Sequence, residues 1–228
     1  MDGGIIISNE IYKILENEIL NLKLKPGISL SEKGLRARFN VSRTPIRGVM
    51  QKLETKGLIT MTPYMGAIVT LLDFDIINQI IYQRVAVESM ILRDFMKICT
   101  PMLIERVRHL VRSSRVLIED KFDARKFFLL DSNLHEVWFA EMKKLYLWNA
   151  FQNAQSSYSR FRLLDIAEMH NYEEIVKEQE RLLDILVKKD FDAVEPWFIQ
   201  HLYGGITRLG DRVYTEFKDY FLHHTCEK

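Results

Sequence analysis

The sequence has few of the residues that build disulfide-linked or membrane-spanning proteins. Of its 228 residues only two are cysteines, Cys99 and Cys226, and they form no C-x-x-C pair. Their scarcity argues against a disulfide framework and a thiolate zinc site, and it indicates a reducing, cytoplasmic compartment. No apolar run approaches the roughly 20 residues that cross a bilayer, so we expect no membrane partner. The first eight residues lack a basic region and a small-residue cleavage site, so we expect no signal peptide.

Familiar catalytic motifs are also missing. The sequence contains no G-x-S-x-G elbow, no H-E-x-x-H pair, no phosphate-binding glycine loop and no dinucleotide fingerprint. Missing motifs do not exclude catalysis, but they favour a binding protein over an enzyme. The net charge is only +1, yet it is unevenly distributed. Residues 1–70 carry ten basic and six acidic side chains, and residues 71–228 carry 22 and 25. A basic first third suits a nucleic-acid module joined to another domain.

The stretch from Ser42 to Arg47 places two arginines at the start of a predicted helix. Ser42 is a candidate N-cap, and Pro45 fits in the first turn, where its missing N–H costs nothing. Thr44 and Arg47 fall on one face, with Arg43 at its edge. The opposite face is an apolar stripe at helical spacing, made of Ile46, Val49, Met50 and Leu53. Such a helix can place its N-terminal end in the DNA major groove. The alternative is a basic, solvated helix start.

The first seventy residues predict three helices followed by a hairpin. The expected helices cover residues 9–22, 32–39 and 42–56. β-Branched residues then predict strands at 58–62 and 67–71, with a turn between them in which Gly66 takes a φ that other residues avoid. This order is typical of a winged helix-turn-helix domain, which we predict for residues 1–72. The alternative is another small α+β module.

Strand signals vanish from residue 73 onward. The apolar periodicity predicts helices over residues 76–98, 101–118, 123–142, 146–166, 172–187 and 192–221. Gly204, Gly205 and Gly210 are expected to kink or split the last of these. The predicted fold is therefore mainly α, with the winged domain followed by an antiparallel bundle of six to seven helices over residues 73–228.

Three polar residues of the bundle are candidates for metal binding. Asp131 and His135 are four residues apart, so they project from one face of a helix and can share a divalent ion. The alternative for this pair is an ordinary i,i+4 hydrogen bond. His201 lies beside Trp197 and Phe198 in the sequence and is either a third ligand or a packed core histidine.

Arginines of the bundle are candidates for binding an anion. Arg84 and Glu88 are again four residues apart, among apolar neighbours. Arg84 can hold an anionic ligand by a bidentate contact, or it can pair with Glu88. Tyr158 and Arg162 lie near the middle of the bundle, where the alternative is a solvated helix face.

Taken together, these residues resemble a known family of regulators. The first part resembles the winged-helix signature of GntR-type transcriptional regulators. The residues that carry this resemblance are Lys25-Pro26-Gly27, Leu30, Leu35, Val41-Ser42-Arg43-Thr44-Pro45-Ile46-Arg47, Leu53, Gly57-Leu58-Ile59 and Gly66. The second part resembles the all-helical ligand-binding FCD domain of the FadR branch. That domain has an Arg…Glu pair on its first helix and Asp-x-x-x-His on a middle helix. The resemblance extends from about residue 9 to about residue 215.

The resemblance implies a homodimer that binds double-stranded DNA at a palindromic operator and responds to a small carboxylate. The residues that would contact DNA are Lys33, Arg43, Thr44, Arg47 and Gly66, the last at the tip of the wing. The residues that would bind the effector are Arg84, Tyr158, Arg162 and Gln179.

The resemblance also implies a divalent metal of the Zn, Ni or Mn class. Many members hold the ion by an aspartate and three histidines, and this chain keeps Asp131, His135 and His201. Gln179 stands where the remaining histidine is expected. Its amide oxygen is a weaker and harder ligand than imidazole. The alternatives are a weakly held metal, an oxygen-preferring ion, or no metal.

We therefore predict a transcriptional regulator, specifically a repressor, and not an enzyme. A small organic acid in the bundle, with or without a metal, would control its binding to DNA. One rival hypothesis is a helical metalloenzyme that uses Asp131 and His135 to activate water, fused to a basic winged module. Another is a winged module that contacts a protein partner, which the paired arginines and the basic charge disfavour.

Overall fold

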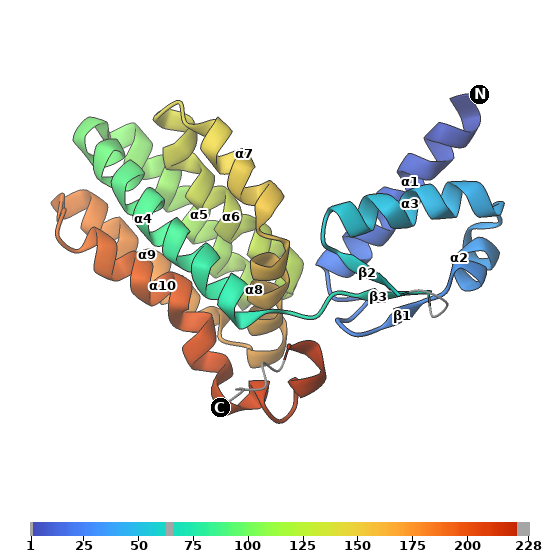
Figure 1. Ribbon diagram of the computed structural model, residues 1–228. Coiled ribbons are helices and arrows are strands. Elements are labelled where there is room, and N and C mark those ends of the chain that lie inside the picture. Colours follow the sequence, from blue (N-terminus) through green and yellow to red (C-terminus); the bar gives the residue numbers. More distant parts are fainter. Residues whose placement is uncertain (1, 63–65, 223–228) are drawn as a thin grey trace. The chain divides into compact units, whose positions relative to one another are not determined.

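The computed structural model describes residues 2–62 and 66–222, and the chain divides into two units. The first unit runs to Phe74 and resumes at Asp211, and the second extends from Asp75 to Gly210. Figure 1 follows the chain through both. Among the described residues, no helix has both the length and the apolar character that a membrane span requires.

The first unit contains the predicted winged helix-turn-helix. Its elements are α1 (Asp2–Leu20), β1 (Ser29–Leu30), α2 (Glu32–Phe39), α3 (Arg43–Thr55), β2 (Ile59–Thr62) and β3 (Gly66–Val69). The strands form an antiparallel sheet in the order β1-β3-β2 (Figure 1). The sequence did not predict β1, because two residues are too short to show the alternation of a strand. The predicted turn at residues 63–65 lies outside the described residues.

Local signals fix the turn between α2 and α3. The Ser31 hydroxyl accepts a hydrogen bond from the Gly34 N–H, which begins α2. Asn40 ends that helix in the left-handed conformation, with φ of 50°, as its short polar side chain permits. The apolar stripe of α3 is fully buried against a core shared with α1, α2 and the sheet, made of Ile11, Leu15, Ile19, Leu35, Ile46, Val49, Met50, Leu53, Leu58, Ile59 and Val69.

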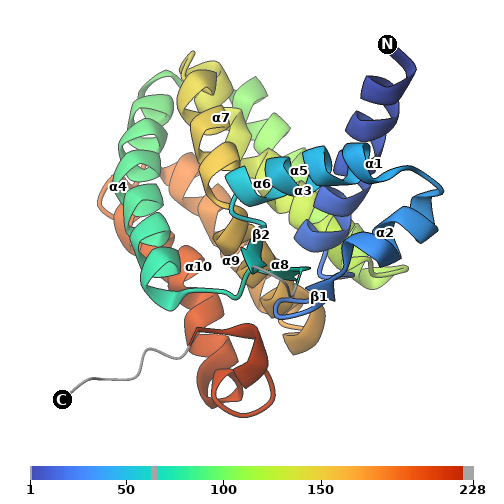
Figure 2. The ribbon, with the colours of Figure 1, turned by 45° about the vertical axis from the view of Figure 1, so that its right-hand side comes forward.

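In the described part of the second unit the chain forms seven helices. They are α4 (Phe74–Ile98), α5 (Pro101–Glu119), α6 (Ala124–Glu141), α7 (Leu145–Ala154), α8 (Ser156–Met169), α9 (Tyr172–Lys188) and α10 (Val194–Leu209). Helix α6 packs against α5, α7 and α8, and α10 packs against α8 and α9 (Figures 1 and 2). This arrangement makes α6 a central element of the bundle.

The prediction of one helix over residues 146–166 is wrong. Helix α7 ends at Ala154 and α8 begins at Ser156, with the buried Gln155 between them at φ −102° and ψ 30°. Two serines follow the break, and serine hydroxyls compete with helical hydrogen bonds. The apolar spacing continues through the break, so periodicity alone could not reveal it.

The predicted last helix is too long. Helix α10 passes through Gly204 and Gly205 without a break and ends at Leu209. A Cβ at Gly205 would lie only 3.1 Å from an oxygen of Asp165, so the glycine allows α10 to approach α8 closely. Gly210, with φ of 45°, then stops the helix, and short 3-10 turns follow at Gly210–Val213 and Lys218–Tyr220.

The segment after Gly210 returns to the first unit. Leu72 forms a parallel bridge with Phe221, in which the Leu72 N–H donates to the Tyr220 carbonyl and the Leu222 N–H donates to the Leu72 carbonyl, each at 2.8 Å. The Phe221 ring stacks on Phe74 with centroids 4.5 Å apart. The boundary predicted after residue 72 lies close to the first crossing between units, whereas residues 211–222 pack with the unit that precedes that boundary.

Candidate functional site

The N-terminal half of α3 presents a polar, exposed face. Arg43 is its first residue, and the Ser42 backbone is extended, but the Ser42 hydroxyl makes no capping hydrogen bond. The capping role predicted for that hydroxyl is therefore wrong. Pro45 lies in the first turn, as expected. Arg43, Thr44 and Arg47 are all exposed, opposite the buried stripe.

Arg43 and Arg47 both contact one acidic residue. Glu32, the first residue of α2, approaches Arg43 Nε with Oε1 at 2.6 Å and Arg47 Nε with Oε2 at 3.3 Å. Its partial burial opposes ionisation, but hydrogen bonds from the two guanidiniums lower the pKa of the Glu32 carboxyl below its ordinary value. No sequence pattern indicates this contact, because it depends on how α2 and α3 pack against each other.

The two other residues expected to contact DNA lie near α2 and the sheet. Lys33 is exposed on α2. Gly66 begins β3 with φ of 94°, and a Cβ there would lie 3.1 Å from the Leu30 carbonyl oxygen. This φ confirms the prediction that Gly66 adopts a conformation that other residues avoid.

The bundle brings three polar residues together from two helices. Asp131 and His135 come from α6 and His201 from α10, and their ligand-type atoms all lie within 4.8 Å of one another. All three side chains are buried. The predicted i,i+4 pair therefore does not stand alone, because His201 joins it from a distant part of the sequence.

A glutamate contacts the Nδ1 atom of each histidine. His135 Nδ1 lies 2.5 Å from Glu88 Oε2, and His201 Nδ1 lies 2.8 Å from Glu178 Oε2. Such contacts place the proton of a neutral imidazole on Nδ1 and leave the Nε2 lone pair for another partner. Neither Nε2 has a hydrogen-bond partner among the described residues. His201 Nε2 lies 3.3 Å from Asp131 Oδ1 without forming a hydrogen bond.

Gln179 of α9 reaches the same cluster. Its Nε2 donates to Asp131 Oδ1 at 2.9 Å, and within the described chain its Oε1 has no hydrogen-bond partner although it is buried. A half-turn of the amide group exchanges the nitrogen for the oxygen. Gln179, the residue that departs from the family pattern, thus lies next to the Asp131 carboxylate. Its amide oxygen is available as a metal ligand.

Burial and neighbouring charges both shift the pKa values of the cluster. Burial alone would raise the pKa of Asp131, but His201 and Arg162 hold it well below its ordinary value. Burial lowers the pKa of His135, and Glu88 only partly offsets this effect. For His201, the nearby carboxylates of Asp131 and Glu178 outweigh burial and raise the pKa. For Asp131 and His201 the nearby opposite charges outweigh the effect of burial, whereas for His135 burial outweighs them.

Arginine and tyrosine side chains line a small cavity beside Asp131 and His135. Arg84 donates through Nε to Glu88 Oε1 at 2.6 Å, and its guanidinium lies 4.9 Å from the centre of the Tyr158 ring. The cavity has a volume of about 10 Å³, and Trp148 and Gln152 of α7 also line it. A volume of that order holds a single water molecule at most. For an organic acid to bind in this cavity, the lining residues would have to move apart.

Arg162 connects the cluster to the end of α10. Its Nη2 lies 3.7 Å from Asp131 Oδ2, and its Nη1 donates to Asp165 Oδ2 at 2.7 Å. Arg208 donates to the same Asp165 carboxylate at 2.7 and 3.1 Å. Tyr158, Arg160 and Arg162 are buried, so the solvated face considered for this part of α8 is wrong. Asp165 and Arg208 were not predicted as site residues, although the i,i+3 spacing of Arg162 and Asp165 is consistent with an ion pair on one helix.

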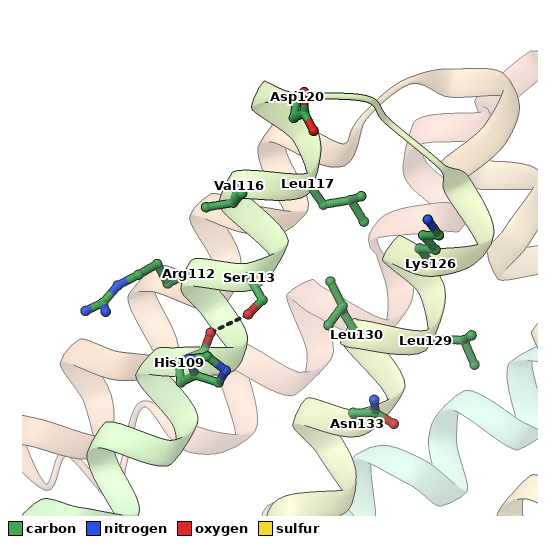
Figure 3. A pocket seen from close by; sticks show the side chains of 10 residues that line it. All are labelled: His109, Arg112, Ser113, Val116, Leu117, Asp120, Lys126, Leu129, Leu130 and Asn133. Atoms are coloured by element: carbon green, nitrogen blue, oxygen red, sulfur yellow. Dashed lines mark hydrogen bonds between the residues drawn. The ribbon is translucent and has the colours of Figure 1, made fainter.

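A larger groove lies between α5 and α6. It has a volume of about 580 Å³, with Leu117 and Leu130 among its apolar walls and His109, Arg112 and Lys126 among its polar residues (Figure 3). It shares no lining residue with the small cavity beside Asp131. The two spaces can therefore be tested independently by substitutions on the same helix, α6.

Comparisons with known proteins agree with this architecture. Residues 7–69 match the family described as "Bacterial regulatory proteins, gntR family", and residues 79–204 match the FCD domain. The chain is 29% identical over 196 residues to the HTH-type transcriptional repressor RspR of Escherichia coli K12, covering 86% of each protein. It is 26% identical over 185 residues to the gluconate operon transcriptional repressor of Bacillus licheniformis, covering 79% of this chain and 75% of that protein.

Solved structures show the same fold. The E. coli McbR/YncC structure superposes with a TM-score of 0.65 at 17% identity, covering 92% of this chain and 98% of the other. One family match covers most of residues 1–74, and the other covers most of residues 75–210. The similarity to RspR extends over both parts of the chain. The chain therefore belongs to the GntR family of bacterial regulatory proteins, in the group that carries an FCD domain, and it is a DNA-binding transcriptional regulator.

Proposed function

We propose that this regulator is a cytoplasmic repressor that binds a palindromic operator as a homodimer, and that a small organic anion in the bundle controls that binding. Two relatives that are named as repressors support the direction of control. The observation that carries the second part is the pair of buried imidazole Nε2 atoms beside Asp131. Each belongs to a histidine whose Nδ1 atom contacts a glutamate.

The DNA contacts in this proposal come from α3 and its neighbours. Arg43, Thr44 and Arg47 would contact the major groove, and Lys33 and Gly66 would contact the DNA from α2 and the wing. Arginine is the commonest reader of guanine, through paired bonds to O6 and N7. Contacts to phosphate would set the affinity and its steep dependence on salt.

The buried cluster fits a divalent metal ion. Asp131, His135 and His201 would hold it, and Gln179 would add an amide oxygen after a half-turn of its side chain. Buried, unpaired Nε2 atoms with carboxylates on Nδ1 are the arrangement that metal-binding histidines adopt. A bound ion would supply fixed positive charge and vacant coordination positions for the carboxylate of an effector.

Side chains of the chain itself would bind and orient the effector. Arg84 and Arg162 offer guanidinium groups, and Tyr158 offers a hydroxyl, next to the cluster. Since the cavity between them is only about 10 Å³, the effector would bind a more open arrangement than this one. A ligand shifts an equilibrium only by its difference in affinity for the two arrangements. Opening of the cavity supplies that difference.

The DNA proposal is tested with an operator selected from a random duplex library. Arg47→Ala should weaken operator binding by about tenfold at matched salt, as expected for loss of a bidentate base contact. Arg125→Ala, which removes the same charge from an exposed site in the second unit, should leave it unchanged. Sedimentation velocity should show a dimer for both variants. Equal operator affinity for Arg47→Ala and the parent protein would refute the assignment of α3.

The metal proposal is tested by calorimetric titration with Zn²⁺, Ni²⁺ and Mn²⁺ alone. His135→Ala should lower the affinity by about tenfold or more, whereas Asn133→Ala, two residues away in the separate groove, should not. Gln179→His should tighten Zn²⁺ binding by at least about tenfold, because imidazole replaces an amide oxygen. Identical titrations for all four proteins would rule out the cluster as the metal site.

The rival hypothesis of a helical metalloenzyme is not favoured. Both family matches and the named relatives are transcriptional regulators. Arg84 and Arg162 place positive charge next to the cluster, which suits binding and orientation of an anion.

A further inference from the structure

Glu32 occupies a fixed position between the two recognition arginines. It is the first residue of α2, directly after the N-cap Ser31, whose hydroxyl bond to the Gly34 N–H anchors that turn. Its two carboxylate oxygens are divided between Arg43 and Arg47, one to each. The side chain of Glu32 is 25% exposed, whereas those of the arginines are 61% and 60% exposed. One partly shielded carboxylate thus holds two largely exposed guanidiniums.

The atoms involved decide what this contact can do. Both contacts are to Nε, at 2.6 Å for Arg43 and 3.3 Å for Arg47. A guanidinium held at Nε can still present the edge formed by Nη1 and Nη2. That edge matches the two acceptors O6 and N7 of guanine. A carboxylate on Nε therefore leaves the base-reading edge available and also restricts its direction.

We propose that Glu32 is a positioning residue for DNA recognition, which orients Arg43 and Arg47 for guanine contacts and disfavours binding to other sequences. The proposal rests on the proposed DNA contacts of the two arginines. Free arginine side chains lose rotamer entropy when they bind, and a side chain already held loses less. The same negative charge repels phosphate, which carries most of the affinity for non-specific DNA.

These two effects act in opposite directions on two kinds of DNA. Removal of Glu32 should weaken operator binding, because the arginines lose their orientation. It should strengthen binding to unrelated duplex, because a repulsive charge is lost. The ratio of operator affinity to non-specific affinity is therefore the quantity that Glu32 controls. A residue with a purely structural role in α2 would weaken both kinds of binding together.

The test compares Glu32→Ala and Glu32→Gln with the parent protein by fluorescence anisotropy. The probes are the selected operator and a mixed-sequence duplex at one salt concentration. Glu32→Ala should lower the affinity ratio by about tenfold, and Glu32→Gln, which keeps an acceptor oxygen but no charge, should fall between. Glu10→Ala, an exposed charge on α1, is the control and should leave the ratio unchanged. Unaltered far-UV circular dichroism and melting should accompany each variant.

The outcomes separate this proposal from the assignment of the arginines. If Arg47→Ala loses operator affinity but both Glu32 variants keep the parent ratio within about twofold, Glu32 is not a positioning residue. A rise in affinity for both DNAs alike would also overturn it, since Glu32 would then only compete with DNA. If Arg47→Ala itself has no effect, the contacts proposed for α3 are wrong. The proposal also predicts that Glu32→Ala lowers operator affinity less in the Arg47→Ala variant than in the parent protein.

Discussion

Gly48 lies inside α3, where glycine is the least favourable residue apart from proline. A Cβ built at Gly48 meets no atom within 4 Å, and the backbone there is helical. Gly48→Ala should therefore stabilise the first unit by about 0.5–1 kcal/mol, through lower entropy of the unfolded chain and better helix propensity. For a unit of under 100 residues, this corresponds to a rise in melting temperature of about 4–8 °C per kcal/mol.

A matched control is present nine residues later. Gly57 also has open space around its Cβ, but its φ is +66°. Gly57→Ala adds the same methyl group and should destabilise the unit by about 1 kcal/mol, because L-residues are strained in that region. All three tryptophans lie in residues 75–210, so their fluorescence reports the second unit and far-UV circular dichroism reports both. The reasoning fails if both substitutions shift the circular dichroism transition in the same direction.

Two further substitutions test the packing, and a double-mutant cycle tests one ion pair. Phe221→Ala should destabilise the first unit by about 3–5 kcal/mol in urea unfolding, since the buried ring leaves a cavity; a loss below about 1 kcal/mol would contradict its role there. Gly205→Ala should lower the melting temperature despite the helix propensity of alanine, because its Cβ would crowd Asp165; a rise like that of Gly48→Ala would refute this. Arg38 lowers the pKa of Glu18, so their pair should contribute stability above the unfolded pKa of about 4.3 and lose it as pH falls through the lower folded pKa. A double-mutant cycle should give under about 1 kcal/mol at pH 7, because the pair is partly exposed; coupling that persists at pH 2 would contradict it.

The sequence predicts the winged domain well because its signals are local. Ser31 and Asn40 mark the ends of α2, the apolar stripe of α3 has helical spacing, and Gly66 marks the start of a strand. Each of these depends on residues within one or two turns of the chain. The break at Gln155 was missed because apolar periodicity does not detect a single non-helical residue.

The candidate sites were only partly predictable from the sequence. Asp131 and His135 share a helix, so their spacing alone places them on one face. His201 joins them through the packing of the bundle; from its sequence neighbours alone it was either a third ligand or a packed core histidine, and no spacing relates it to the other two. The contacts of Glu32 and Asp165 depend on how neighbouring helices pack, which a single sequence does not encode in any short pattern. Whether these residues bind metal, effector or DNA stays a prediction.

The return of residues 211–222 to the first unit changes how the protein can be dissected. In topological terms, the helical bundle is an insertion within the first unit, joined at Phe74–Asp75 and again at Gly210–Asp211. A fragment that stops at Phe74 would lose the strand bridge to Leu72 and the ring that stacks on Phe74. A single proteolytic cut at either joint would leave the two units tethered through the other. Isolation of a complete first unit therefore requires excision of residues 75–210 and a linker in their place.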